Sequence, residues 1–316
     1  MSHILVTGAQ GFVGQALVQR LLADGLGGRP VERLTALDLA FPAPPSDSRV
    51  CQIAGSIADP ALYREACNRP VDAVFHLASV PGGAAEQNYE LGRSINLEAT
   101  LGLLETMRNQ ARPPRFVFAS SVAVYGADLP QYVDAQTQPA PGLTYGAHKL
   151  IGEILVADAS RRGWVVGCSL RVPGVVARPG DGAGLISAYM SRLFWCLAAG
   201  EPITVPVGPH GTSWWISVGA CVDNLLLAAT LPAARLNPQR CYQMPAAWLS
   251  VAEVVDALAQ RFGPQCRELV RYAPNPQVER LFAAYPELDT HEAEALGFAH
   301  DGSAEQLVER AIAPGR

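Results

Sequence analysis

The sequence predicts an α/β fold in which a doubly wound parallel sheet is followed by a smaller, mixed C-terminal lobe. Three observations lead to this prediction. Short runs of β-forming residues alternate with segments of helical periodicity in the first half, a pattern typical of a parallel sheet with helices on both faces. A glycine-rich turn joins the first such run to the first helical segment. After residue 172 the pattern becomes irregular and rich in glycine and proline.

The elements follow in chain order. Strands are predicted at 3–7, 34–38, 49–53, 73–77, 115–119 and 164–171. Helices are predicted after the first strand, before the fifth strand and at about 145–162. We therefore place a first domain, which contains the parallel sheet, at 1–172, with a return of the chain at about 216–243, and a second lobe at 173–316. In the second half, a strand end followed by a helix is expected at 217–231, and helices are expected at 187–199, 251–262, 277–282 and 292–296.

Composition narrows the classes of function. Of the 316 residues, 49% are hydrophobic and 17% are charged, which excludes a disordered chain. The net charge of −5 gives no reason to expect a nucleic-acid partner. Without a leader peptide or an apolar run of ~18 residues, we expect a cytoplasmic protein with no membrane contact. The seven cysteines lack a metal-binding spacing, so we expect free thiols and no metal site.

The turn after the first strand carries a phosphate-binding pattern. Its sequence from residue 7 is Thr-Gly-Ala-Gln-Gly-Phe-Val-Gly. Gly8 permits a tight turn, Gly11 lets the backbone approach a pyrophosphate, and Gly14 allows close packing of the helix on the strand. The N–H groups that begin the helix attract phosphate. The combination predicts a Rossmann-type dinucleotide site, against the alternative of an ordinary turn.

An acidic residue at the end of the second strand indicates which dinucleotide binds. Asp38 ends the strand at 34–38, and the next residue, Leu39, is not basic. A carboxylate there accepts hydrogen bonds from the ribose hydroxyls and repels a 2′-phosphate. We therefore expect NAD rather than NADP, the alternative being an aspartate that only belongs to a turn.

A tyrosine and the only lysine of the chain lie four residues apart in the helix predicted at 145–162. Tyr145 and Lys149 therefore share one helix face. A tyrosine phenol has a pKa of ~10, too high for a base at neutral pH. An ammonium about 5 Å away, at an effective dielectric constant of about 20, favours the phenolate by roughly 3 kcal/mol, or about two pKa units. The spacing thus predicts a base, Tyr145, whose pKa is lowered by Lys149.

Two further polar residues have competing interpretations. Ser121 follows the fifth strand at the ligand-binding edge of the sheet, where its hydroxyl can hold a substrate oxygen or merely cap the strand. Asn96, at the head of the helix before that strand, positions the cofactor or a water, or satisfies buried backbone. Both interpretations of Asn96 stay open.

Together these motifs resemble the extended short-chain dehydrogenase/reductase superfamily, from the glycine loop through Tyr145-x-x-x-Lys149 to the segment Leu170-Arg-Val-Pro173. The resemblance implies that Tyr145 is the catalytic base, that Lys149 binds the nicotinamide ribose and lowers the tyrosine pKa, and that Ser121 orients the substrate. It also implies the contacts with NAD, which are Gly8, Gly11, Phe12, Val13, Gly14, Asp38, Ser56, Ile57, Leu77, Ala78, Asn96, Tyr145, Lys149 and Pro173. Ser56 stands where many members carry aspartate.

Two departures separate this chain from the sugar-nucleotide epimerases of that superfamily. Those enzymes carry asparagine after Leu-Arg-x-x, where it helps to hold the substrate diphosphate, and this chain has Gly174. Their later Arg-Asp-x-x-x-Val segment is also missing, because residues 213–217 read Ser-Trp-Trp-Ile-Ser. Both departures argue against a nucleotide-sugar substrate.

The second half is similar to a subgroup that contains D-erythronate dehydrogenases, whose Arg-Leu-Pro…Arg-Pro segment is matched at residues 171–179. This similarity implies the NAD-dependent oxidation of a secondary hydroxyl of a small sugar acid, namely the C2 hydroxyl, to a 2-keto acid. The alternatives are a nucleotide-sugar epimerase or dehydratase that uses bound NAD, and a non-catalytic NAD-sensing protein. The family resemblance also implies a homodimer formed through the helices at 96–110 and 145–162.

A small polyhydroxy acid needs a cation for its carboxylate. Arg178 is the first candidate, with an ordinary surface arginine as the alternative, and His210 and Arg192 are weaker candidates. The expected substrate contacts are Ser79, Ser121, Tyr145, Arg178 and Trp215. For Ser79 and Trp215, packing is the alternative, and His148 is expected to be structural.

Overall fold

The computed structural model describes residues 2–180 and 187–312, and the chain divides into two compact units. Unit 1 consists of residues 1–124, 141–171 and 222–243, and unit 2 consists of residues 125–140, 172–221 and 244–316. Residues 125–140, which the sequence placed in the first domain, belong to unit 2, because β6 (Tyr132–Val133) pairs with β14 (Glu287–Leu288).

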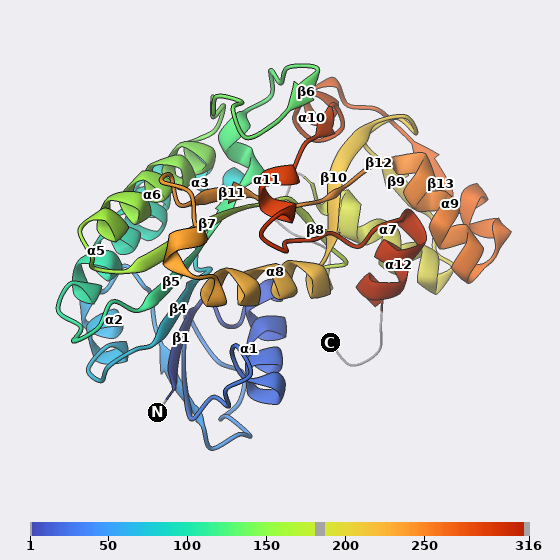
Figure 1. The fold of residues 1–316 in the computed structure, drawn as a ribbon. Helices are drawn as coiled ribbons and strands as arrows, with labels where there is room; N and C mark the ends of the chain where they lie inside the picture. Colours follow the sequence, from blue (N-terminus) through green and yellow to red (C-terminus); the bar gives the residue numbers. More distant parts are fainter. Residues whose placement is uncertain (1, 181–186, 313–316) are drawn as a thin grey trace. The chain divides into compact units, whose positions relative to one another are not determined.

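Unit 1 is built on a seven-stranded parallel sheet of order β11-β7-β5-β4-β1-β2-β3, which confirms the predicted fold class (Figure 1). The strands are β1 (His3–Thr7), β2 (Arg33–Asp38), β3 (Val50–Ala54), β4 (Ala73–His76), β5 (Arg115–Ser121), β7 (Val166–Val172) and β11 (Cys241–Gln243). Strand order reverses between β1 and β4, the point at which such sheets bind ligands. β11 was not predicted as a separate strand, because three residues are too few to show an alternation.

Helices cover both faces of this sheet. On one face, α2 (Pro60–Ala66), α5 (Ala99–Met107) and α6 (Thr144–Arg161) share an apolar core with the central strands. On the opposite face lie α1 (Phe12–Asp24) and most of α8 (Val218–Thr230), which are joined by an ion pair between Arg20 and Asp223 (Figure 1). The helix predicted before the fifth strand is interrupted, since α3 (Gly82–Gln87), α4 (Tyr89–Gly92) and a π-helical turn (Arg93–Glu98) precede α5.

Unit 2 contains a mixed three-stranded sheet and two pairs of short strands. In the three-stranded sheet, β10 (Thr212–Ser217) lies between the antiparallel β12 (Ala247–Ser250) and the parallel β8 (Gly174–Val176). The strand pairs are β9 (Ile203–Val205) with β13 (Val270–Tyr272), and β6 with β14. The helices of this unit are α7 (Ala188–Ala199), α9 (Val251–Phe262), α10 (Pro276–Phe282), α11 (His291–Glu294) and α12 (Ala304–Ile312).

Three of these helices close the core of unit 2. α7, α9 and α12 contribute Leu193, Leu258 and Leu307 to an apolar cluster that also contains Trp215. α12 was not predicted from the sequence, although Leu307 and Ala311 lie one helical turn apart on its buried side.

No helix in the described part of the chain is long and apolar enough to span a membrane. Within residues 2–180 and 187–312, no cluster of three His, Cys, Asp or Glu side chains is arranged to hold a metal ion. All seven cysteines are free thiols.

The contact between α6 and β5 generates a prediction about stability. A Cβ atom added to Gly152 would lie 2.5 Å from the Cζ atom of the buried Phe118 ring. We expect Gly152→Ala to lower the free energy of unfolding by about 1–3 kcal/mol, because the ring or the helix must shift. Urea denaturation measures this change. Gly142→Ala is the matched control, since a Cβ there meets nothing within 4 Å, and equal effects of the two substitutions would contradict the prediction.

Candidate active site

The glycine loop between β1 and α1 touches two neighbouring strand ends. Gly8 adopts a φ of 72°, and its N–H donates a hydrogen bond to the Leu37 carbonyl at the end of β2, at 2.9 Å. A Cβ on Gly8 would lie 2.7 Å from the backbone nitrogen of Ala78, after β4. A Cβ on Gly14 would lie 2.1 Å from the Gly8 carbonyl oxygen. Both positions therefore require glycine.

The first turn of α1 is suited to an anion. Its N-cap is Gly11, which has no side chain to cap the helix, and the turn contains no acidic residue. The partial positive charge of the helix N-terminus is therefore not offset by a carboxylate of that turn. Phe12 and Val13, two further predicted contacts, are half-buried there. A pyrophosphate suits this turn, because neither a capping side chain nor an acidic residue competes for its backbone N–H groups.

Asp38 is oriented by the backbone around it. Its Oδ2 accepts a hydrogen bond from the Gln10 N–H in the glycine loop, and its Oδ1 accepts one from the Leu39 N–H, both at 2.7 Å. An ionised carboxylate has about four acceptor positions, so two remain for the hydroxyls of a ribose. The structure thus brings Asp38 and the glycine loop together, as the NAD prediction requires.

The predicted contacts after β3 and β4 lie at the same edge of the sheet. Ile57 is buried, and the Ser56 hydroxyl accepts a hydrogen bond from the Ala58 N–H at 3.3 Å. Leu77 and Ala78 are half-buried, whereas Ser79 is exposed. These residues follow strands that are paired in register with β1 and β2.

The side chain of Asn96 forms hydrogen bonds with the backbone of the loop after β4. It is 2% exposed, its Oδ1 accepts a hydrogen bond from the Val80 N–H at 2.7 Å, and its Nδ2 donates one to the Val80 carbonyl at 3.0 Å. Of the two interpretations left open by the sequence, the structure supports the satisfaction of buried backbone. Asn96 therefore fixes the loop after β4 from the π-helical turn.

The buried side chain of His76 links β1 to α5. His76 Nε2 lies 2.8 Å from the Thr100 hydroxyl, which itself donates to the Asn96 carbonyl. His76 Nδ1 lies 2.7 Å from the Thr7 hydroxyl, which accepts from the Ala78 N–H. Burial lowers the pKa of His76 to about 3, with Lys149 adding to the effect, so the ring is neutral.

The structure brings Tyr145 and Lys149 together on one face of α6. Lys149 Nζ lies 5.6 Å from the centroid of the Tyr145 ring and donates a hydrogen bond to the Ala119 carbonyl of β5 at 2.7 Å. Lys149 is 2% exposed, and burial lowers its pKa to about 7, while the charge of Glu153 acts in the opposite direction. Tyr145 is half-buried.

Ser121 ends β5 two residues after Ala119. Its Oγ accepts a hydrogen bond from the Ala123 N–H at 3.1 Å, so the hydroxyl proton can be donated to a substrate oxygen. A Cβ on Gly146 would lie 2.3 Å from the Ala123 carbonyl oxygen, so α6 begins in direct contact with the turn that follows Ser121. Ser121 and Tyr145 therefore flank one close contact within unit 1.

The structure corrects one predicted substrate contact in unit 2. Trp215 has no exposed surface, and its Nε1 donates a hydrogen bond to the Leu249 carbonyl at 2.9 Å. The expectation that Trp215 lines a pocket is wrong, and packing, the alternative, holds. The reason is that the face of β10 that carries Trp215 is covered by the apolar cluster to which α7, α9 and α12 contribute.

The other predicted residues of unit 2 are Pro173, Arg178, Arg192 and His210. The Arg178 backbone is held at both ends, because its N–H donates to the Ser191 hydroxyl at 3.0 Å and its carbonyl accepts from Trp195 Nε1 at 2.8 Å. Pro173 is buried, and Arg192 and His210 are exposed. The role of Arg178 toward a carboxylate stays a prediction.

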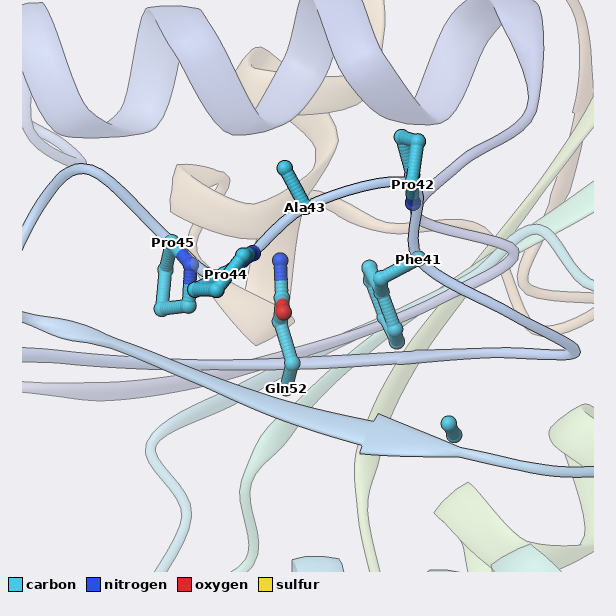
Figure 2. A pocket seen from close by; sticks show the side chains of 7 residues that line it. Phe41, Pro42, Ala43, Pro44, Pro45 and Gln52 are labelled. Carbon is cyan, nitrogen blue, oxygen red and sulfur yellow. The ribbon is translucent and has the colours of Figure 1, made fainter.

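An open pocket of about 520 Å³ lies beside the edge strand β3. Figure 2 shows the Gln52 side chain pointing from the strand toward the proline-rich segment that covers it. The pocket is lined by Phe41, Pro42, Ala43, Pro44, Pro45, Gln52 and Ala54. None of the predicted site residues lines this pocket, although Ala54 is paired with Asp38.

Sequence reasoning missed a buried charge cluster behind Lys149. Arg171 Nη2 lies 2.9 Å from Glu153 Oε2, and the Ser120 hydroxyl donates to Glu153 Oε1. The available signal was the repeat of Tyr145, Lys149 and Glu153 at every fourth position of one helix.

Comparison with known proteins identifies a family and relatives that span nearly the whole chain. The model of the NAD dependent epimerase/dehydratase family matches residues 4–241. A D-erythronate dehydrogenase of Cupriavidus necator is 37% identical over 312 residues, 97% of this chain and 96% of that protein. A D-erythronate dehydrogenase of Haemophilus influenzae is 31% identical over 311 residues, 98% of each. The crystal structure of a nucleoside-diphosphate-sugar epimerase from Agrobacterium tumefaciens superposes with a TM-score of 0.92 at 32% identity, covering 98% of this chain and 92% of that one.

The surroundings of Asp38 generate a prediction about cofactor choice. We expect Asp38→Ser to weaken NAD⁺ binding about 10- to 100-fold, because two hydrogen bonds to a charged acceptor are lost. Binding of NADP⁺ should weaken less or improve. Calorimetric titration with each dinucleotide measures both affinities. Asp47→Asn is the matched control, because Asp47 lies in the same connection and binds Arg49 instead. An unchanged ratio of the two affinities in Asp38→Ser would refute the assignment.

Proposed function

The chain belongs to the NAD-dependent epimerase/dehydratase family, and we propose that it is a dehydrogenase that oxidises the C2 hydroxyl of a small sugar acid such as D-erythronate to the 2-keto acid. The observation that carries the proposal is the buried Lys149 ammonium held against the Tyr145 ring at the end of β5. The near-full-length similarity to two D-erythronate dehydrogenases supports the choice of substrate.

The residues of unit 1 supply the acid–base chemistry in this proposal. Ser121 donates a hydrogen bond to the substrate oxygen and holds it near Tyr145. The Tyr145 phenolate takes the hydroxyl proton, and the nearby positive charge of Lys149 favours that phenolate. Bound NAD⁺ supplies the hydride acceptor for the hydrogen on C2.

The cofactor would be held by the features at the carboxyl edge of the sheet. The glycine loop and the first turn of α1 would bind the pyrophosphate, and Asp38 would bind the adenosine ribose. Lys149 would bind the nicotinamide ribose. Asn96 and His76 would act indirectly, because both hold the loop after β4.

A nucleotide-sugar epimerase is the second candidate, favoured by the likeness to the Agrobacterium tumefaciens structure. Position 174 argues against it. A Cβ on Gly174 would lie 2.6 Å from the Met190 Cε and 3.0 Å from the Trp214 carbonyl oxygen, so a side chain there would require Met190 to move. The asparagine that the resemblance assigns to diphosphate binding is absent, and the end of the Met190 side chain lies where its side chain would begin. We favour a substrate without a nucleotide.

A substrate panel tests the function. The purified protein is incubated with NAD⁺ and D-erythronate, L-threonate or hexuronates, and NADH is followed by absorbance. We expect turnover of a four-carbon acid. Parallel reactions with UDP-glucose and UDP-galactose are followed by chromatography. Interconversion of these sugars without net NADH, together with no oxidation of any acid, would overturn the proposal in favour of an epimerase.

Tyr145→Phe tests the base. We expect kcat for the sugar acid to fall about 10²- to 10⁴-fold, because general base catalysis is lost. NAD⁺ affinity should stay within about threefold, since binding energy comes mainly from the glycine loop and Asp38. Steady-state kinetics and NAD⁺ titration measure the two effects. Tyr89→Phe is the control for an exposed phenol on α4, and wild-type turnover by Tyr145→Phe would show that another group is the base.

We also propose that the protein is a homodimer. Leu101 on α5 and Ile151 and Ile154 on α6 are 39%, 39% and 61% exposed, and these two helices pack together. Exposed apolar side chains on adjacent helices mark an interaction surface. Light scattering after size exclusion should give a dimer for the wild type and a monomer for Ile154→Asp. Leu39→Asp, 70% exposed elsewhere in unit 1, should stay dimeric, and a monomeric wild type would contradict the proposal.

A further inference from the structure

Glu153 lies one turn beyond Lys149 on the face of α6 that carries Tyr145. Residues four apart on a helix have Cβ atoms about 5–6 Å apart, so Lys149 lies between the other two. Glu153 is 5% exposed and Lys149 is 2% exposed. A carboxylate of α6 is therefore buried next to the ammonium that the proposed function requires.

The Glu153 carboxylate is held by two groups on neighbouring strands. Arg171 of β7 forms a two-pronged pair with it, from Nε to Oε1 at 3.0 Å and from Nη2 to Oε2 at 2.9 Å. The Ser120 hydroxyl of β5 donates to Oε1 as well. Gln243 of β11 ties the same arrangement to the sheet edge, because its Nε2 donates to the Arg171 carbonyl at 3.0 Å. Such geometry fixes both charges in place.

Two opposing effects determine the pKa of Lys149, and therefore its charge at neutral pH. Burial disfavours the ammonium and lowers its pKa to about 7, and Glu153 raises the pKa. His76, on the neighbouring strand, carries no charge at neutral pH. The Cys241 thiol beside Glu153 is also neutral, because burial raises its pKa well above the usual value.

Charges at the protein surface have a smaller influence on this site. The described ionisable groups on α6 and on the elements packed against it include Glu86, Tyr89, Glu90, Arg93, Glu98, Glu105, Arg115, Tyr145, His148, Asp158, Arg161 and Arg162. Arg93 is paired with Glu90 and Glu98, and Asp158 is paired with both neighbouring arginines. Exposed charges are screened by water and salt, whereas the Glu153–Arg171 pair is buried beside Lys149.

We propose that Glu153 is a positioning residue that keeps Lys149 in its ammonium form, and that Arg171 limits the strength of this effect. The functional meaning rests on the proposed function, because Lys149 favours the Tyr145 phenolate only while it is charged. The alternative is that the pair only holds α6 against the sheet. The two roles predict different results for the charge of Lys149. If the pair only holds the helix, loss of Glu153 and loss of Arg171 have the same effect. In the proposed role, the two losses shift the titration of Lys149 in opposite directions.

The chain offers a direct measurement, because Lys149 is its only lysine. Protein labelled with ¹³C-lysine, freed of any tag, gives one ε-CH₂ signal whose chemical shift reports the charge of Lys149. In Glu153→Gln the titration midpoint should fall by about one pH unit, because a negative charge is lost and the positive Arg171 remains. In Arg171→Met the midpoint should rise by a similar amount. The double variant should return close to the wild type.

Two controls separate charge from structure. Glu153→Asp keeps the charge and should leave the midpoint close to that of the wild type. Asp158→Asn makes the same charge change as Glu153→Gln at an exposed site of α6, and it should leave the midpoint unchanged. Circular dichroism checks that each variant is folded. If Glu153→Gln does not fold, the rise expected for Arg171→Met decides.

The outcomes distinguish this proposal from the proposed function. Midpoints that shift in opposite directions support the role of Glu153 even if no sugar acid is oxidised, in which case the substrate assignment alone fails. If sugar acids are oxidised but both single variants leave the midpoint unchanged, or shift it in the same direction, the role of Glu153 is overturned. With an active enzyme, the pH profile of kcat/KM should move to lower pH in Glu153→Gln and to higher pH in Arg171→Met.

Discussion

The close approach of α6 to β5 is the constraint on which the candidate site depends. Gly146 and Gly152 leave no side chain between the helix and the strand, so the helix lies against the Ala123 carbonyl and the Phe118 ring. The Lys149 ammonium then reaches the Ala119 carbonyl. Burying an ammonium is costly unless it is hydrogen-bonded, and this contact provides the bond. The lysine, its orientation toward Tyr145 and the end of β5 are therefore determined together.

The same contact explains how the end of β5 serves two purposes. Each of its last three residues forms a hydrogen bond. The Ala119 carbonyl accepts one from Lys149, and the Ser120 hydroxyl donates one to Glu153. The Ser121 hydroxyl accepts one from the Ala123 N–H, beyond the end of the strand. Alternate side chains of a strand point to opposite faces, so Ser120 turns inward to the charge pair while Ser121 can face a ligand. The end of β5 thus separates the buried Glu153–Arg171 pair from the side of the strand where the chemistry is proposed.

The parts of this design that the sequence predicted are those with local signals. Strand periodicity located six strands of the parallel sheet to within two residues, and parallel pairing brings their carboxyl ends, including Asp38, to one edge. The parts that it could not predict depend on partners distant in the chain. The pairing of Glu153 with Arg171 joins a helix to a strand, and charged residues in either element normally face water. The burial of Trp215 was not predicted because nothing in its own segment shows that helices distant in the chain cover that face of β10.

The single lysine of the chain acquires a physical reason from its surroundings. The other 23 of the 24 lysine and arginine residues are arginine. At position 149 the cation lies 4.8 Å from the centroid of the Phe118 ring and is nearly inaccessible to water. A planar guanidinium with five donors would leave several of them without acceptors there, whereas a compact ammonium needs fewer. Arginine also stays charged in almost any environment, while the charge of a buried lysine responds to its neighbours. At position 149, burial lowers the pKa of the cation and the Glu153 carboxylate raises it. These two effects can change the charge of a lysine but not that of an arginine, so the site requires lysine.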